Sequence, residues 1–284
     1  MRKLTFTNTR GETVVFDNSA PFLMTKLEGT GAPSADIQSQ RAPYQDGVTY
    51  LDTFLQPRSL SVEGAVMAKT RKDIFSLRQT LSRVLNPKLG PGTLRYEYDG
   101  GVKEIQAVIE GAPIFPNQYG ETFQVFLISV LCPSPFWTDT PTTSREMSYI
   151  MGGFGFALRL PASFSRRSFR RTFFNEGDVE TPVKIEFRGP AQNPTIMNNT
   201  TGEFVRVKCN LGENDVLHIH TTFGNKRVEV VRADGNKENA FHYLDLASTF
   251  FQLQTGENEL EYNSNNDSTK TKVTIKYKNR YVGV

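Results

Sequence analysis

The sequence is poor in the residues from which catalytic and metal sites are most often built. Its 284 residues include two cysteines, three histidines and one tryptophan. Cys132 and Cys209 lie in strand-like sequence and lack the CxxC spacing of zinc and redox motifs. We therefore expect two buried thiols, as in a protein made in a reducing cytoplasm, and neither a disulfide nor a metal site.

Long hydrophobic runs are also missing. The longest apolar stretch, around Val125 to Leu131, is far shorter than the ~20 residues of a transmembrane helix. The charged start Met1-Arg2-Lys3 is followed by alternating residues, without the apolar core of a signal peptide. The sequence therefore predicts a soluble chain with no membrane span, which is not exported by that route.

Net charge is small as well. The chain has 33 basic and 30 acidic residues, and its net charge of +3 is too low to indicate a nucleic-acid partner. Residues 163–171, however, interleave arginines with phenylalanines. This pattern suits a protein interface, a solvated surface or a site for single-stranded nucleic acid. We favour the protein interface, with no specific nucleic acid as a partner; the residues concerned are Arg166, Arg167, Arg170 and Arg171.

What the chain does contain is the alternation of apolar and polar residues that is typical of β-strands. Leu60, Val62, Gly64 and Val66 alternate with polar neighbours, and Asp99-Gly100-Gly101 is a strong hairpin signal. In the first half we expect strands at residues 3–8, 13–16, 22–27, 48–55, 60–66, 93–98, 102–109 and 122–131, with 48–55 and 60–66 forming a pair.

One helix is predicted in this half. Thr70 is a suitable N-cap with Asp73 three residues later, and Asn86-Pro87 ends the helical pattern. The apolar side chains between them recur at helical spacing, so we expect them to form core and not a ligand site. They are Ile74, Leu77, Leu81, Val84 and Leu85.

A rigid connector ends the first half. The strand before it is apolar on both faces, which predicts burial on both sides. Pro133 and Pro135 then remove two backbone donors and favour an extended exit, and Phe136 and Trp137 follow at once. We expect a domain boundary here, with domains at residues 1–135 and 136–284.

The second half has short strands with regular turn signals and no helical pattern. We expect strands at residues 154–160, 169–174, 183–187, 203–209, 216–221, 227–231, 250–254, 258–262 and 272–277. This density is typical of a two-sheet sandwich of the jelly-roll kind.

The order of these features resembles the distal tail protein family of long-tailed, non-contractile bacteriophages. The motifs are the helix that ends in Leu85-Asn86-Pro87, the exit Cys132–Trp137, the segment Asn175–Pro182, the run Asn193–Gly202 and the late Leu253–Asn258. The resemblance implies a mainly β protein. Its first domain would be a β-sandwich or split barrel with one α-helix, and its second a galectin-like jelly-roll β-sandwich.

The resemblance also implies a non-enzymatic function and a set of partners. The first domain would form a homo-hexameric ring, the structural hub of a phage or prophage tail tip. This ring would join the tail tube protein to the tail-associated tip protein and carry receptor-binding proteins. The chain would be made in the cytoplasm of the host bacterium and act at the virion tail tip, with no cofactor.

Residues 29–47 are the best candidates for contacts within such a ring. They are rich in Gly, Ala, Pro, Ser, Gln and Asp and have almost nothing apolar, so we expect an arm without structure of its own that orders against a neighbouring subunit. A disordered loop is the alternative. By this hypothesis Arg41, Gln45, Asp46 and Arg58 lie at subunit contacts.

The sequence leaves two alternatives to the hub. His218 and His220 share one face of a predicted strand, and with His242 they could form a three-histidine zinc site, although no acidic residue is placed as a general base. The main rival is a carbohydrate-binding β-sandwich in host-surface adhesion. It would need an aromatic residue that stacks on sugar, for which Phe223, Phe241 and Tyr243 are available.

Overall fold

The computed structural model describes residues 2–117, 120–147, 169–266 and 270–284. The chain folds into two compact units: unit 1 contains Met1–Thr140 and Arg280–Val284, and unit 2 contains Pro141–Asn279. This division differs from the predicted domains, 1–135 and 136–284, because the connector with Trp137 and the end of the chain both belong to unit 1. These described residues are mainly β with one α-helix, as the resemblance implied.

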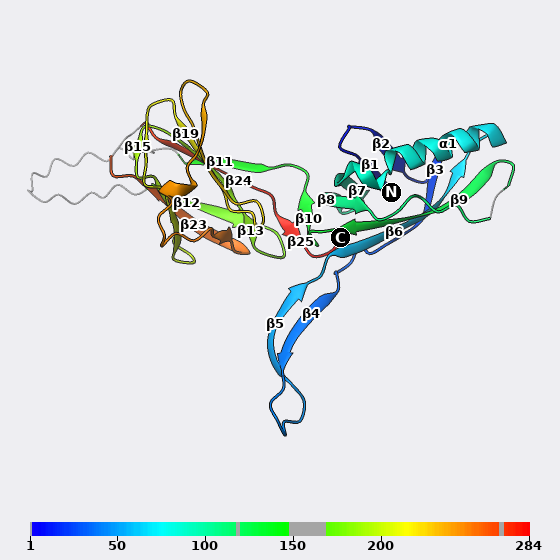
Figure 1. Cartoon of the computed structure of the whole chain (residues 1–284), viewed down its shortest axis with the longest axis horizontal. Helices are drawn as coiled ribbons and strands as arrows, with labels where there is room; N and C mark the ends of the chain where they lie inside the picture. The colour runs from blue at the N-terminus through cyan, green and yellow to red at the C-terminus, as the bar shows by residue number, and fades with distance from the viewer. Residues whose placement is uncertain (1, 118–119, 148–168, 267–269) are drawn as a thin grey trace, which may run out of the picture. The chain divides into compact units, whose positions relative to one another are not determined.

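Unit 1 is built on one antiparallel sheet (Figure 1). Its main path runs in the order β2-β1-β7-β8-β9-β6-β3, and β10 pairs with both β8 and β25. The bounds are β1 (Lys3–Thr7), β2 (Thr13–Phe16), β3 (Phe22–Glu28), β6 (Arg58–Met67), β7 (Gly92–Tyr98), β8 (Gly101–Ile109), β9 (Phe123–Cys132), β10 (Trp137–Asp139) and β25 (Arg280–Tyr281). All but β10 and β25 lie where strands were predicted.

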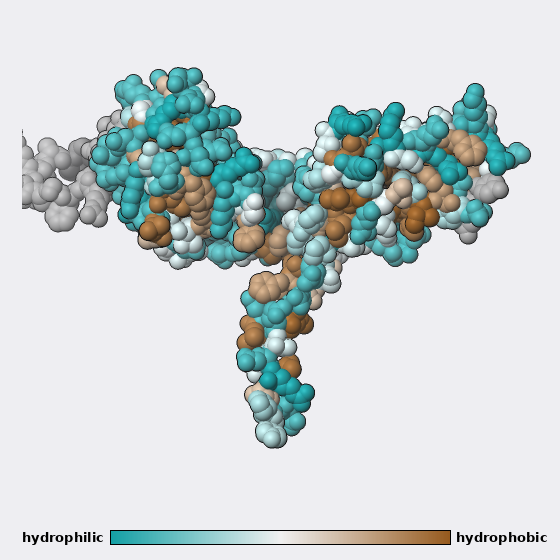
Figure 2. All heavy atoms as spheres, in the orientation of Figure 1, coloured by the Kyte–Doolittle hydropathy of each residue, from teal (hydrophilic) through white to brown (hydrophobic). Residues whose placement is uncertain are grey.

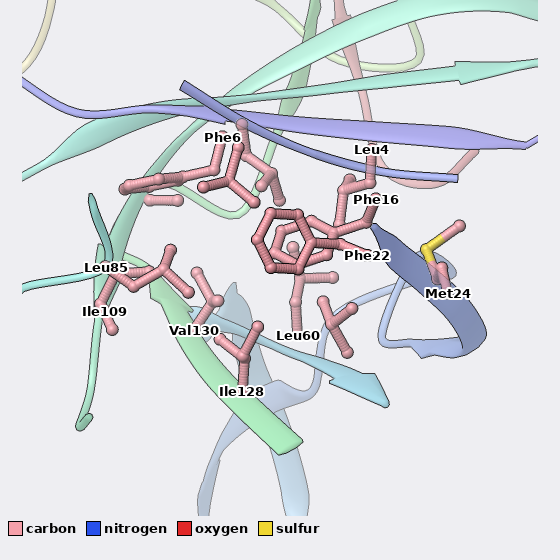
Figure 3. Close-up of a cluster of buried hydrophobic side chains, with 14 of the residues drawn as sticks. Leu4, Phe6, Phe16, Phe22, Met24, Leu60, Leu85, Ile109, Ile128 and Val130 are labelled. Carbon is pink, nitrogen blue, oxygen red and sulfur yellow. The ribbon is translucent and has the colours of Figure 1, made fainter. Parts of the chain in front are cut away.

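Alternation along these strands buries one face of the sheet. Figure 3 shows the resulting cluster, in which Phe6, Phe16 and Phe22 meet side chains of the opposing strands. The prediction that the strand before the connector is buried on both faces was wrong: along β9 every second residue from Gln124 to Cys132 is buried and those between are half-buried. A strand with one half-exposed face therefore leads into the connector.

The predicted helix is confirmed as α1 (Arg71–Val84). Thr70 Oγ1 accepts a hydrogen bond from the Asp73 N–H at 3.2 Å, so the expected N-cap is in place. Ile74, Leu81 and Val84 are buried in the core, whereas Leu77 is only partly buried against it. The 3₁₀ turn η1 (Pro87–Leu89) follows. Within the described ranges, no helix combines the length and the apolar composition that a membrane crossing requires.

The segment between β3 and β6 differs from its prediction. Residues 29–47 are not without structure, because β4 (Ala35–Gln40) pairs with β5 (Thr49–Leu55) as a separate two-stranded sheet. The predicted pair of residues 48–55 with 60–66 was therefore wrong: β6 pairs instead with β3 and β9. The polar composition of β4 concealed it, since strand patterns are recognised by a buried face and β4 has none.

Unit 2 consists of two main sheets whose inner faces share one core. The six-stranded sheet has the order β11-β24-β14-β19-β20-β21, and the four-stranded sheet the order β12-β23-β16-β17. The bounds are β11 (Thr143–Met147), β12 (Phe169–Asn175), β14 (Lys184–Arg188), β16 (Thr195–Asn198), β17 (Glu203–Arg206), β19 (Val216–His220), β20 (Arg227–Val231), β21 (Lys237–Asn239), β23 (Gly256–Asn263) and β24 (Lys272–Tyr277).

Shorter elements connect these sheets. They are β13 (Thr181–Pro182) with β22 (Gln252–Leu253), β15 (Ala191–Gln192) with β18 (Asn210–Leu211), and the 3₁₀ turn η2 (Phe241–Tyr243). The strand predicted at 250–254 is thus reduced to two residues, and the one predicted at 154–160 lies outside the described residues.

Candidate protein interface

The β4–β5 hairpin projects from the sheet of unit 1 (Figure 1). Every residue of β4 is exposed, and so is every residue of β5 except Leu55, which is half-buried. The hairpin therefore has no core of its own. A lone two-stranded hairpin is at best marginally stable in water, so this element gains most from a surface that covers it.

Large hydrophobic side chains cluster on this exposed element. Figure 2 shows brown patches of hydrophobic residues along the hairpin. Tyr44 at the tip is as exposed as a side chain in an extended peptide, with a relative accessibility of 107%. An exposed apolar surface of this kind marks a site of interaction. Its large residues are Ile37, Tyr44, Val48, Tyr50, Leu51 and Phe54.

The register gives the hairpin two different faces. Ile37 lies opposite Thr53 and Ser39 opposite Tyr50, so these side chains share a face without charged residues. A bulge at Leu51 makes this possible, because the register shifts between Gln38 and Ser39 and moves Tyr50 to the face of Ile37. The other face pairs Asp36 with Phe54 and Gln38 with Asp52, and so carries two carboxylates.

Two predicted contact residues shape the tip of the hairpin. Arg41 donates from Nε to the carbonyl oxygen of Gln45 at 3.1 Å. The Gln45 amide accepts from the Ala42 N–H at 3.0 Å and donates to Thr49 Oγ1 at 3.0 Å. These bonds hold the loop that presents Tyr44. Asp46 is exposed beside it, so Arg41, Gln45 and Asp46 all lie on the projecting element.

The fourth predicted contact residue, Arg58, is in a different position. Its side chain is buried, with 1% of the residue exposed, and it cannot face another subunit. Its guanidinium donates to the carbonyl oxygens of Gly29 at 2.5 Å and Pro135 at 2.9 Å, and also to those of Gly31 and Val282. Arg58 was predicted to lie at a subunit contact, but its side chain instead joins the base of the hairpin to the proline connector and to the end of the chain.

Other contacts reinforce the base of the hairpin. Gly29 has a φ of +88°, and a Cβ there would lie 2.1 Å from the Ser59 carbonyl oxygen, so only glycine fits. The Val284 N–H donates to the Thr30 carbonyl at 3.1 Å, and the Gln56 N–H to that of Ser34 at 2.8 Å. The hairpin thus leaves unit 1 from a fixed base.

The predicted arginine cluster of unit 2 is only partly described. Arg166 and Arg167 lie outside the described residues. On β12, Arg170 forms ion pairs with Glu261 at 2.8 Å and Glu259 at 3.2 Å, and Arg171 donates to the carbonyl oxygen of Glu146. Because both guanidinium groups are engaged within unit 2, an interface role for Arg170 and Arg171 stays a prediction.

The histidines do not come together as a metal site. His218 and His220 share a face of β19, where His218 Nδ1 lies 4.0 Å from Glu186 Oε1, and His242 lies in η2. Among the described residues, no group of three His, Cys, Asp or Glu side chains could hold a metal ion. Both cysteines are buried, and burial raises the pKa of Cys132 to about 12 and that of Cys209 to about 11, which keeps the thiols neutral and unreactive.

The aromatic residues considered for sugar binding lie on the surface of unit 2. Phe223 is 89% exposed, and Phe241 stacks on Phe250 with ring centroids 5.7 Å apart. Lys226 lies over the rings of both Phe223 and Phe250. Such a surface suits a protein partner as well as a sugar, so carbohydrate binding stays a prediction.

Sequence reasoning found the projecting segment but missed the exposed apolar side chains that make it a candidate interface. The sequence predicted a strand at residues 48–55 paired with residues 60–66, which would have placed Tyr50, Leu51 and Phe54 in the main sheet. One signal in the sequence could have distinguished an exposed hairpin from a strand of the core. Residues 35–40 contain a single large apolar side chain, Ile37, so they could not complete a core layer with residues 48–55.

Two family models match most of the chain. A model described as phage tail protein RIFT-related domain matches residues 9–132, and one described as siphovirus-type tail component, C-terminal domain, matches residues 176–281. No curated protein matches the chain.

Solved structures share its fold. The Dit protein (gp 19.1) of phage SPP1, described as a paradigm of the hub adsorption apparatus in phages that infect Gram-positive bacteria, has a TM-score of 0.72 at 14% identity over 99% of both chains. Chains of the phage P2 baseplate in its activated conformation, with Ca and with Sr, have TM-scores of 0.58 and 0.59 at 12% identity over 100% of both chains.

Proposed function

This chain belongs to the siphovirus-type tail components, the distal tail proteins of siphophages, and from this premise we propose how it acts as the hub of a tail tip. It is a structural protein of the virion tail and not an enzyme. It interacts with other tail proteins.

Unit 1 forms a ring of six copies in which the β4–β5 hairpin of each copy packs on its neighbour. The observation that carries this proposal is the exposure of the whole hairpin, with its large apolar side chains, on a fixed base. A contact between two different surfaces of the same chain repeats head to tail and closes when the rotation fits, which yields a ring. The uncharged face with Ile37 and Tyr50 is the one that packs, because its burial costs no charge desolvation.

The ring joins the tail tube protein on one side to the tail-associated tip protein on the other, and receptor-binding proteins attach at the periphery through unit 2. The similarity to the SPP1 hub protein over nearly the full length of both chains supports this assignment. The two free, buried cysteines support synthesis in the reducing cytoplasm of the host.

Shortening the hairpin tests the ring. Ala35 and Leu55 are paired across the hairpin, so replacing residues 36–54 by Asn-Gly closes it with a two-residue turn and leaves Arg58 and its carbonyl partners in place. We expect a folded monomer that still unfolds in a cooperative transition, whereas the full chain forms six-fold rings. Light scattering gives the mass and negative-stain images give the symmetry. Rings formed by the shortened protein would exclude the hairpin as the ring contact.

Single substitutions locate the packing face. Ile37→Lys and Tyr50→Lys place a charge on the uncharged face, whereas Gln38→Lys places the same charge on the opposite face of the same strands. We expect the first two to abolish ring formation and the third to preserve it. Since all three positions are exposed in the single chain, each variant should fold normally.

A further inference from the structure

The outer face of the six-stranded sheet in unit 2 carries a line of basic side chains. In the register of this sheet, Lys276 lies opposite Lys184, Lys184 opposite His220, and His220 opposite Arg227. Four strands, β24, β14, β19 and β20, thus contribute one basic residue each. We name these four residues the basic strip. With neighbouring strands about 4.8 Å apart, the strip spans about 14 Å.

The strip is unfavourable for the isolated fold. Like charges directly opposite each other on neighbouring strands repel and reduce stability. The pKa of His220 is lowered, first by partial burial and then by the charges of Lys184, His218 and Arg227, whereas Glu229 raises it. The imidazole between Lys184 and Arg227 is therefore held in its neutral form. A fold that places cations side by side gains stability when an anion binds between them.

Carboxylates on the same face neutralise only part of the strip. Lys276 Nζ lies 2.5 Å from Glu186 Oε1, but Arg227 donates from Nε to the neutral amide oxygen of Asn225. Within the described part of the chain, Lys184 and Arg227 have no carboxylate at ion-pair distance. These two exposed cations remain available to an external anion.

The next row of the sheet indicates the kind of anion. This row lies on the same face, two residues further along each strand. In it Glu186 and Glu229 lie on either side of His218. A ligand of uniformly high negative charge, such as a polyphosphate, would meet these carboxylates as well as the cations. A peptide does not have this difficulty, because it can direct carboxylates to the strip and neutral or basic groups to the glutamates.

We propose that the basic strip binds an acidic, extended segment of another tail protein, through carboxylates that pair with Lys184 and Arg227. A hollow of about 350 Å³ opens on the same face beside Lys276, between β11, β24 and β14, and accommodates the neighbouring side chains of that segment. The strip lies in unit 2 and involves no residue of the hairpin. The inference therefore goes beyond the ring contact and does not depend on it.

The test uses the full chain, with hexaglutamate peptide and inorganic tripolyphosphate as probes in titration calorimetry at low salt. We expect hexaglutamate to bind, and the double variant Lys184→Gln with Arg227→Gln to weaken binding at least about tenfold, the equivalent of 1.4 kcal/mol. The control variant, Lys237→Gln with Lys270→Gln, removes the same charge from two exposed positions of unit 2 outside the strip and should change affinity less than about twofold.

The melting temperature provides a second readout. If Lys184 had only a structural role, its replacement would not raise the melting temperature. Removing the repulsion should raise the melting temperature of the unliganded Lys184→Gln variant by about 1–4 °C, although the variant binds more weakly. The proposal would be overturned if hexaglutamate did not bind, or if tripolyphosphate bound more tightly than hexaglutamate. It would also be overturned if the double variant bound hexaglutamate with unchanged affinity, or if Lys184→Gln had a lowered melting temperature. We expect these variants still to form rings. A negative result for the basic strip would therefore leave the proposed hub function unaffected.

Discussion

Arg58 and Cys132 lie directly opposite each other in the β6–β9 ladder, and both side chains are buried. The thiol stays neutral, because burial raises its pKa to about 12 even though the nearby guanidinium acts in the opposite direction. Arg58 is therefore a buried cation that is held by carbonyl oxygens and by Trp137, whose ring centroid lies 5.9 Å from its guanidinium carbon. Carbonyl dipoles and a ring face replace the water that the charge has lost.

Removing this guanidinium should destabilise unit 1 strongly. Arg58→Met leaves the carbonyls of Gly29, Gly31, Pro135 and Val282 without their donor, so we expect a loss of at least about 3 kcal/mol in urea unfolding. Arg58→Lys should recover only part of the lost free energy of unfolding, since an ammonium group cannot reach all four carbonyl oxygens.

The matched control is Arg95→Met, on the solvent side of β7, where the side chain is 45% exposed. This change should cost less than about 0.5 kcal/mol. If Arg58→Met and Arg95→Met unfold at the same urea concentration, the buried guanidinium does not hold the hairpin base together.

The core face of α1 can be tested at two leucines one turn apart. Leu81 is fully buried, whereas Leu77 is only partly buried against the core. We expect Leu81→Ala to lower the free energy of unfolding by about 2–5 kcal/mol and Leu77→Ala by clearly less. Chemical denaturation of both variants measures the difference, and equal losses would contradict the helix orientation.

The two thiols should resist alkylation in the folded protein. Burial raises the pKa of Cys132 to about 12 and that of Cys209 to about 11, so almost no thiolate exists at pH 8. Iodoacetamide should label neither residue within minutes in native buffer and both in urea. On prolonged native incubation Cys209 should react before Cys132, because it is 9% exposed and Cys132 is fully buried. Mass spectrometry of digests identifies the site, and rapid native labelling of Cys132 would be inconsistent with the fold.

Asp215 should make the stability of unit 2 depend on pH. Burial raises its pKa, but hydrogen bonds from the Gly212 N–H, Arg232 and the Ala233 N–H outweigh this effect and hold the pKa below 3.8. A carboxylate with a lowered pKa stabilises the folded state above its unfolded pKa and loses this contribution as the pH falls through its folded pKa.

We therefore expect Asp215→Asn to lower the free energy of unfolding by about 1–2 kcal/mol at pH 7, and the deficit to shrink below pH 3.8. The control is Asp234→Asn, at an exposed turn where asparagine can accept the same hydrogen bond from the Asn236 N–H. Asp234→Asn should leave the free energy of unfolding unchanged both at pH 7 and below pH 3.8. A deficit for Asp215→Asn that is constant from pH 7 to pH 3 would show that shape and not charge matters at this position.

The candidate interface was harder to predict than the fold, and β4 and Arg58 show why. Pattern reading locates strands through their buried face, so it found β6 and β9 but not β4, whose residues are all exposed. It grouped Arg58 with the subunit contacts, although the structure buries this side chain. The carbonyls that bury it come from Gly29, Gly31, Pro135 and Val282, which are far apart in the chain.

The sequence by itself determined the class of this protein: alternating strands, one capped helix and a proline connector exclude a βαβ enzyme fold, and the order of its motifs indicates the tail-component family. These are local properties, set by backbone propensity and side-chain period. Only the tertiary structure decided that residues 35–55 form an exposed hairpin, that the chain's end returns to its base, and that four basic residues meet on one sheet face. Each of these depends on strand register and on contacts between distant segments, because the free energy of such contacts comes from neighbours that the local sequence does not specify.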